Sequence, residues 1–257
     1  NDNYRSSNPR LETAITEFGT HAVQHSNPIN SNHIAAIWLA DVLPRWAYNG
    51  LDIVTYYSLE DGGTGLGNSR GLMGISGGTR IDVRPIYYTM FMYSQYFGNV
   101  MVQSSTSDTD QNIVVWASKD TSDGSLRLML VNLTGSNATT NIHIRGYNPT
   151  VGYAYKMTST NPMSMANPDS FTNHWTTING YKIPDYDINN PSTFRNAVAA
   201  IRPETVQVAN SFSYTLPARS AVAMAPARET ARSAAASAAG MSSMYGTACT
   251  HSGAPSR

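Results

Sequence analysis

The first sixty residues alternate apolar runs with one amphipathic segment. Residues 13–19 form a short apolar run that ends in a carboxylate and a glycine, which predicts a buried strand leading into a loop. Residues 32–48 carry apolar side chains at an irregular helical period, follow a cluster of N-cap residues, and stop at Gly50. Residues 51–59 are β-branched and aromatic, as in a strand covered on both faces. The predicted order is therefore strand, helix, strand.

A glycine-rich segment and a second helix follow. Residues 61–78 contain eight glycines, which predicts a long mobile or substrate-facing loop rather than a regular element. Pro85 suits the first position of a helix, and residues 86–97 are apolar nearly all round. Such a helix is expected to lie wedged between two layers of structure and to end at Gly98.

Beyond Gly98 the apolar pattern changes from helical to alternating. Short strands separated by turn residues are predicted at 100–102, 113–117, 126–131, 141–144 and 151–155. A final hairpin of 211–216 and 220–224 would close a β-sandwich.

The predicted elements divide the chain into three parts. Residues 1–98 form the first part and residues 99–226 the β-sandwich, with a polar insertion at about 158–203. Residues 227–257 are an Ala/Ser-rich tail with little apolar bulk to bury.

Composition narrows the class of partner. The 257 residues contain 17 Lys and Arg and 17 Asp and Glu, so no long-range field attracts nucleic acid or an anionic membrane. Only 13% of residues are charged, which suits a neutral partner such as a carbohydrate. No apolar run approaches the roughly 20 residues that span a bilayer.

Several features suggest an exported protein. Cys249 is the only cysteine, so no disulfide forms within the chain. Asn132 and Asn137 each begin an Asn-x-Thr glycosylation pattern in a predicted turn between strands. The chain begins at Asn1 and no signal peptide opens it, which indicates a processed product or a fragment.

Glu17 is the leading functional residue. A carboxylate at the C-terminal tip of a parallel strand lies where (β/α)8 barrels hold their catalytic groups. The alternative is a structural acid that caps a loop or binds an arginine. Glu60 and Asp61, at the end of the second predicted strand, either contact a ligand or face solvent as loop acids.

Three segments resemble the second half of a clan A glycoside hydrolase of the β-xylosidase and iduronidase type. Residues 15–19 resemble the nucleophile strand, and residues 55–61 resemble the eighth barrel strand. Residues 70–74 leading to 84–88 resemble the glycine-rich loop and the helix with an Arg-Pro-x-Tyr-Tyr start that follow the eighth strand. The resemblance implies an α/β plus all-β fold, the C-terminal portion of a (β/α)8 TIM barrel followed by an antiparallel β-sandwich. Residues 1–98 would be that barrel portion.

The resemblance also implies roles for individual residues. Glu17 would be the nucleophile of a retaining glycosidase, with His21, Tyr57, Glu60 and Asp61 contacting the substrate. Tyr57 stands where family members tend to have tryptophan. The acid/base, which follows the fourth barrel strand in this clan, is not in this sequence. It would come from an N-terminal barrel half, either a separate chain or a missing segment. Such a mechanism requires no metal or organic cofactor.

Other interpretations stay open. The fold could serve as a non-catalytic structural or carbohydrate-binding subunit of an extracellular assembly. Trp175, Tyr181 and Tyr186 either stack on a polysaccharide or pack the insertion against the sandwich. A metal site of His21, His25 and His33 is less favoured than ordinary loop histidines, because no cysteine or tight helical pair accompanies them. The glycines at 63, 65 and 67 lack the lysine of a phosphate loop.

Overall fold

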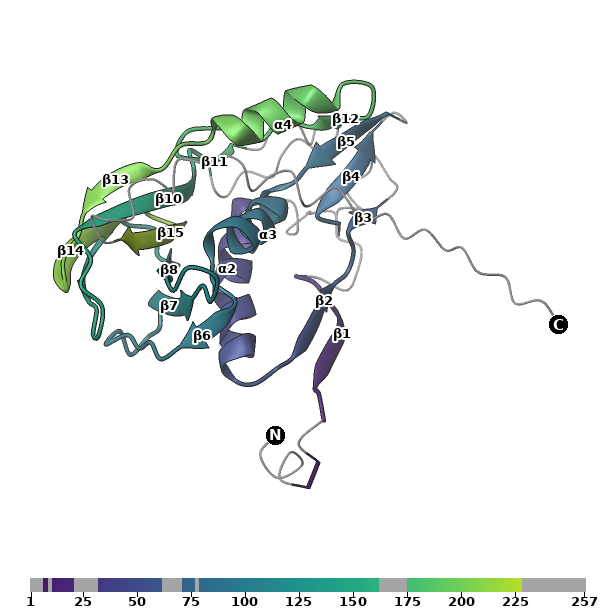
Figure 1. Cartoon of the computed structure of the whole chain (residues 1–257). Coiled ribbons are helices and arrows are strands. Elements are labelled where there is room, and N and C mark those ends of the chain that lie inside the picture. The colour runs from purple at the N-terminus through teal and green to yellow at the C-terminus, as the bar shows by residue number, and fades with distance from the viewer. Residues whose placement is uncertain are drawn as a thin grey trace.

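The structure is a computed structural model that describes residues 7–8, 11–20, 32–61, 71–76, 79–161 and 175–227 (Figure 1). Strands β1 (Ala14–Phe18) and β2 (Ile53–Tyr56) pair in parallel, and helix α2 (His33–Tyr48) lies between them in sequence. The side chain of Asn32 accepts a hydrogen bond from the Ala35 amide at 3.0 Å, which caps α2 as predicted. Gly50, at a φ of 81°, turns the chain back into β2.

Among the described residues, only one face of the β1–β2 pair is covered. Val54 and Tyr56 point toward α2, and Tyr56 is buried. Ile53 and Tyr57, on the alternate face, each keep 47% of their surface exposed. The expectation of a second strand covered on both faces is therefore wrong for the chain by itself.

The glycine-rich segment contains regular structure where a long loop was predicted. Strand β4 (Met73–Ser76) pairs in parallel with β3 (Glu60–Asp61) and antiparallel with β5 (Arg80–Val83). Strand β12 (Tyr186–Asp187) completes this four-stranded sheet from far along the sequence. The prediction of a loop across 61–78 is thus wrong for residues 73–76. The glycines at 62, 63, 65, 67, 77 and 78 lie outside the described residues.

Helix α3 (Pro85–Tyr96) lies between two layers, as its apolar circumference predicts. Ile86 packs with Tyr56 and with Leu39 of α2. Tyr88 and Met92 instead join the larger core that α2 and α3 share with the neighbouring sheet.

The second part of the chain is built on a seven-stranded antiparallel sheet. Its path runs β11–β10–β15–β8–β7–β6, and β13 pairs with the other end of β10. The strands are β6 (Val100–Val102), β7 (Ile113–Lys119), β8 (Leu126–Asn132), β10 (Val151–Ser159), β11 (Thr176–Ile178), β13 (Glu204–Gln207) and β15 (Ser220–Ala227).

The central strands of this sheet are buried on both faces. Met129 and Val131 of β8 face the helices, whereas Leu128 and Leu130 face a two-stranded sheet on the opposite side. That sheet pairs β9 (Ala138–His143) with β14 (Ser211–Leu216). The large sheet therefore lies between the helical layer and β9–β14.

Strands β14 and β15 do not form the predicted hairpin. β14 pairs with β9, whereas β15 pairs with β8 and β10, so the turn at 217–219 crosses from one sheet to the other. The alternation of each strand is compatible with either pairing. Each strand instead turns its apolar side chains toward the core between the sheets, Tyr214 and Leu216 from β14 and Val222 and Met224 from β15.

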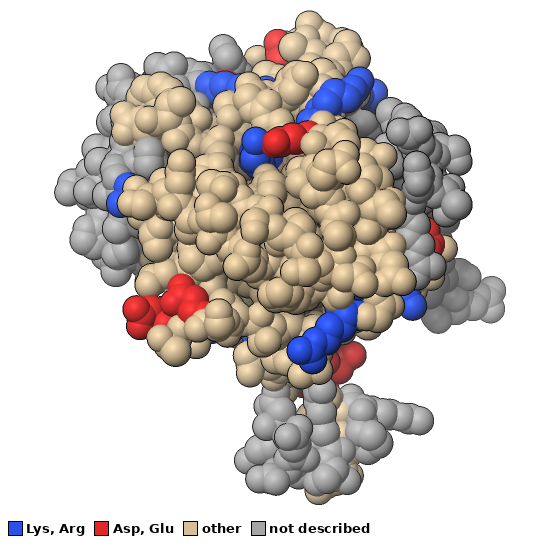
Figure 2. All heavy atoms as spheres, turned by 90° about the vertical axis from the view of Figure 1, so that its left-hand side faces the viewer, with Lys and Arg blue, Asp and Glu red and all other residues tan. Residues whose placement is uncertain are grey.

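The described part of the polar insertion contains more regular structure than its composition suggests. Besides β11 and β12 it forms helix α4 (Pro191–Ala200), whose Phe194 and Val198 join the core under the helices. The face that carries β13 and β14 shows only scattered charged side chains, in keeping with the low charge of the sequence (Figure 2). The Ala/Ser-rich tail beyond residue 227 lies outside the described residues.

Candidate functional site

Glu17 and Tyr57 lie at the C-terminal ends of the neighbouring strands β1 and β2. The Tyr57 amide donates a 2.8 Å hydrogen bond to the Phe18 carbonyl, which extends the parallel pairing by one step. Ile15 pairs with Val54 and Phe18 with Tyr56, so two residues of β1 lie opposite one of β2. Glu17 is one of these two residues. Such a bulge redirects a side chain at a strand end.

Aromatic packing fixes which face Glu17 occupies. The Phe18 ring contacts the rings of Trp46 and Tyr56 edge-on, at centroid distances of 4.9 and 5.1 Å. Phe18 therefore faces α2, and Glu17 is exposed on the opposite side. Ile53 and Tyr57 share that open side. The structure thus gathers a carboxylate and an aromatic ring on one open face at the end of a parallel pair.

Gly19 allows the two strand ends to approach each other. A Cβ atom at this position would lie 3.3 Å from the carbonyl oxygen of Tyr57, tighter than nine in ten real Cβ contacts. The peptide bond between Tyr57 and Ser58 is cis. The glycine directly after the carboxylate is explained by this close backbone approach.

The segment after Tyr57 is held by the following sheet. Amides of Leu72 and Met73 donate to the carbonyls of Ser58 and Leu59 at 2.9 and 3.0 Å. This pairing carries the backbone of Glu60 and Asp61 into β3. The side chains of Glu60 and Asp61 lie outside the described residues, as does His21.

Arg84 is a buried arginine for which the sequence suggests no role. It is 1% exposed, and its guanidinium donates a 2.9 Å hydrogen bond to the Gly71 carbonyl. Its backbone amide donates to the Leu72 carbonyl at 3.2 Å. A Cβ on Gly74 would lie 2.5 Å from a guanidinium nitrogen, so Arg84 packs directly on β4. Arg84 therefore positions the segment that holds the end of β2. The Arg-Pro pair before a helix was the only sequence signal.

His33, in the first turn of α2, links the helix to the sandwich. Nε2 lies 2.7 Å from the Arg219 carbonyl and Nδ1 lies 3.0 Å from the Thr176 hydroxyl. A carbonyl only accepts, so Nε2 carries the proton and Nδ1 accepts from Thr176. Burial lowers the pKa of His33 to about 4, although the Arg219 carbonyl opposes the shift. Both ring nitrogens are occupied, which removes His33 from any metal site.

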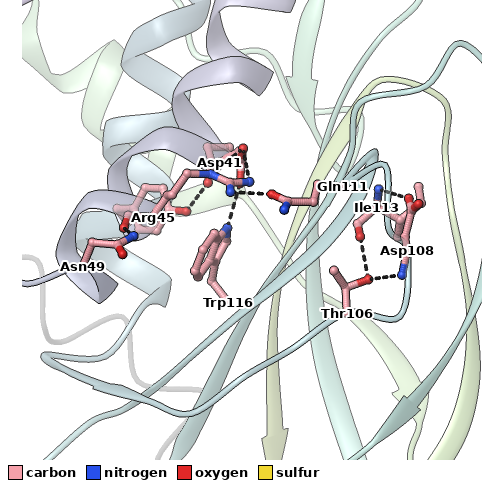
Figure 3. Close-up of polar contacts among 10 residues, drawn as sticks. Asp41, Arg45, Asn49, Thr106, Asp108, Gln111, Ile113 and Trp116 are labelled. Carbon is pink, nitrogen blue, oxygen red and sulfur yellow. Dashed lines mark hydrogen bonds and ion pairs between the residues drawn. The ribbon is translucent and has the colours of Figure 1, made fainter.

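The buried acid Asp41 joins α2 to β7 (Figure 3). Its carboxylate accepts a 3.1 Å hydrogen bond from the Trp116 indole and hydrogen bonds of 2.9 to 3.3 Å from Arg45. The Arg45 guanidinium also lies over the Trp116 ring, 5.4 Å from its centroid. Burial, with a further contribution from Asp41, raises the pKa of Tyr93 well above its usual range. Both oxygens of the Asp41 carboxylate accept hydrogen bonds within this junction, so we assign Asp41 a structural role.

The two glycosylation patterns differ in exposure. The Asn132 side chain is fully buried, and its amide nitrogen donates to the carbonyls of Ser136 and Pro217, both at 2.9 Å. A glycan on that nitrogen is incompatible with the folded sheet, so the expectation for Asn132 is wrong. Asn137 is exposed, and glycosylation there stays a prediction.

No helix in the described part of the chain is long and apolar enough to cross a membrane. Among the same residues, no three His, Cys, Asp or Glu side chains gather as metal ligands would.

Comparison with solved proteins defines the class of fold. Neither a protein-family model nor a curated protein sequence matches the chain. Solved structures do match, among them clan A glycoside hydrolases of families 51, 30 and 44. At this level the resemblance drawn from the sequence is confirmed.

Three of these structures show the extent of the likeness. An α-L-arabinofuranosidase of family 51 from Thermotoga petrophila superposes with a TM-score of 0.61 at 14% identity, over 84% of this chain and 43% of its own. The catalytic domain of the family 30 xylanase C from Talaromyces cellulolyticus gives 0.52 at 20% identity, over 86% and 42%. A family 44 endoglucanase from Clostridium thermocellum gives 0.53 at 20% identity, over 88% and 34%. The chain thus spans less than half of each of these proteins.

Proposed function

We propose that this chain is the C-terminal portion of a retaining glycosidase and carries its nucleophile, Glu17. The main support is the position of Glu17 on the open face at the C-terminal end of β1, beside the parallel strand β2, within a glycoside hydrolase fold. In a (β/α)8 barrel this end of the strands holds the catalytic groups. β1 and β2 would be the seventh and eighth barrel strands, and residues 99–226 the accessory β-sandwich.

The chemistry divides into two displacements. A carboxylate oxygen of Glu17 attacks the anomeric carbon while the bond to the leaving oxygen breaks, which gives a glycosyl ester on Glu17. A second carboxyl group protonates the leaving oxygen. The same group then deprotonates the water that displaces Glu17 from the sugar. It must lie about 5 Å from Glu17.

The acid/base and the other barrel strands would come from polypeptide outside this chain. Two parallel strands do not make a stable open sheet, and Ile53 and Tyr57 already present an apolar surface for further strands. Tyr57, His21, Glu60 and Asp61 would contact sugar hydroxyls or ring faces around Glu17. A neutral carbohydrate substrate and an extracellular location fit the balanced, low charge of the chain.

Glu17→Gln in the protein with its complete barrel tests the proposal. We expect kcat for aryl xylosides and arabinofuranosides to fall on the order of a thousandfold, equivalent to about 4 kcal/mol of transition-state stabilisation. The matched control is Glu12→Gln, because Glu12 is also exposed but precedes the other end of β1. Activated 2-deoxy-2-fluoro glycosides should label the peptide that contains Glu17, as seen by mass spectrometry.

Two results would contradict the assignment. Unchanged hydrolysis by Glu17→Gln would exclude Glu17 as nucleophile. An inactive wild-type protein that still binds polysaccharide would favour a non-catalytic carbohydrate-binding subunit instead.

A further inference from the structure

The segment 175–187 of the insertion, here called the insertion arm, contacts the catalytic end of the β1–α2–β2 unit. The Thr176 hydroxyl forms a hydrogen bond with the ring of His33 in the first turn of α2. The Ile183 amide donates to the Tyr88 hydroxyl in the first turn of α3 at 2.8 Å. Tyr186 pairs with Ile81 of β5. The C-terminal ends of β1 and β2 point toward the same end of the molecule (Figure 1).

The arm begins with a rigid hairpin. Ile178 and Tyr181 exchange two backbone hydrogen bonds of 2.9 Å around Asn179 and Gly180, which have φ angles of 50° and 81°. The Asn179 side chain accepts from the Lys156 amide and donates to the carbonyls of Ala154 and Arg202, at 2.8 to 2.9 Å. The hairpin is therefore fixed to β10 before any ligand arrives.

The aromatic residues of the arm differ in exposure. Tyr186 packs edge-on against Phe194, with 5.6 Å between ring centroids, and so belongs to the core. Trp175 and Tyr181 keep 43% and 40% of their surface exposed, although Thr176 and Ile178 between them are fully buried. Residues 175–181 contain no charged side chain. This hairpin is anchored to β10, and its exposed side chains are aromatic and uncharged. Such a surface suits a flat ligand that is polar but neutral.

We infer that residues 175–181 of the insertion arm bind a neutral polysaccharide, with Trp175 stacked on a sugar ring as a distal subsite for the chain that enters the catalytic end. The choice of ligand class rests on the proposed glycosidase function. Indole presents a wide apolar face to the C–H groups of a pyranose, and a hairpin that is already fixed to β10 loses little conformational entropy on binding. The substrate would therefore be a polymer rather than a short glycoside.

Affinity electrophoresis in gels that contain soluble xylan, mixed-linkage β-glucan or arabinan tests binding without catalysis. We expect at least one polymer to retard the wild-type protein. Trp175→Ala should raise the apparent Kd for that polymer at least about fivefold, and Trp175→Tyr should retain most of the binding. The control is Tyr48→Ala, because Tyr48 is 46% exposed but lies at the opposite end of α2.

Kinetics on two substrates separate this inference from the proposed function. Trp175→Ala should raise KM for the retained polymer severalfold and leave kcat/KM for aryl glycosides unchanged. Glu17→Gln should abolish turnover and leave retardation in the gel unchanged. Equal losses on polymer and aryl glycoside would overturn the inference, as would wild-type mobility that no polymer alters. Activity that survives Glu17→Gln would refute the nucleophile alone.

Discussion

His33 shows how burial makes one residue sensitive to pH. Its pKa is lowered from 6.5 to about 4 in the folded protein. Between these values the unfolded chain binds a proton that the folded chain does not, so stability falls as the pH falls through this window. The stability contribution is complete above about pH 6.5. The full loss would be about 3 kcal/mol at pH 4.

Urea unfolding of the wild-type protein and His33→Gln, measured from pH 7.5 to 4.5, checks this prediction. The difference in unfolding free energy between them should shrink steadily below pH 6.5, because glutamine does not titrate. Parallel pH profiles for the two proteins would show that His33 is not the group responsible.

Gly74 illustrates a residue whose missing side chain matters. Alanine there would place Cβ 2.5 Å from a nitrogen of the Arg84 guanidinium. Arg84 is buried, so its side chain cannot shift into solvent to relieve the clash. We expect Gly74→Ala to cost about 2 kcal/mol of unfolding free energy, as overpacking does. Gly135→Ala is the control, because its nearest neighbour atom lies 3.4 Å away on Arg219 and the site is exposed. It should stay within about 0.5 kcal/mol of wild type in thermal or urea melts.

At the scale of elements, local signals predicted single elements better than their partners. The Asn32 cap, Pro85 and the periodicity of α2 and α3 are encoded within one turn of helix, so both helices agree with the sequence. Pairing depends on distant residues. The close spacing of β14 and β15 suggests a hairpin. Yet β14 pairs with β9 and β15 pairs with β8, so the two strands lie in different sheets.

The candidate site was predictable in the same uneven way. The apolar run before Glu17 and the following glycine are local, and β1 forms as predicted, although its residues are exposed or half-buried in this chain rather than buried. The bulge at Glu17 depends on the register with β2, and the burial of Arg84 depends on β4. Neither contact leaves a periodic pattern in the sequence. Strand β4, which packs against Arg84, therefore cannot be recognised within the glycine-rich segment.

The junction of α2 with β7 makes a prediction at this scale. Asp41→Asn leaves the Trp116 indole and Arg45 without a charged acceptor in a largely buried site, so we expect a loss of about 2 kcal/mol. A double-mutant cycle with Trp116→Phe should give a coupling energy of about 1 kcal/mol in urea unfolding. The control is Glu204→Gln, which breaks the partly exposed ion pair with Lys156 and should cost less than about 1 kcal/mol. Additive effects of Asp41 and Trp116 would argue against the junction.

Across the whole molecule, the two expected domains share one core. Ala36 and Ile37 of α2, Tyr88 of α3 and Val131 of β8 all belong to the same buried cluster. A barrel portion and a sandwich with separate cores would unfold separately, whereas a shared core couples them. The helices therefore owe much of their stability to the sheet rather than to β1 and β2.

This distribution of packing predicts a gradient of hydrogen exchange. The amides of β8 lie between β7 and β15 under side chains that are at most 4% exposed from Leu128 to Val131, so they should exchange only on global unfolding. Among the described residues β1 pairs with β2 alone, and its open face carries exposed Glu17. Peptides covering 11–20 should exchange at least about a hundredfold faster than peptides covering 126–132.

Mass spectrometry of the exchanged peptides measures this gradient, and the protein with a complete barrel supplies the decisive comparison. Further strands beside β1 and β2 would cover Ile53 and Tyr57 and pair the open strand edge, so protection of 11–20 and 51–59 should rise while that of 126–132 stays constant. Equal protection of 11–20 with and without the other strands would mean that the open face of β1 and β2 is a finished surface. Glu17 would then lie outside any barrel.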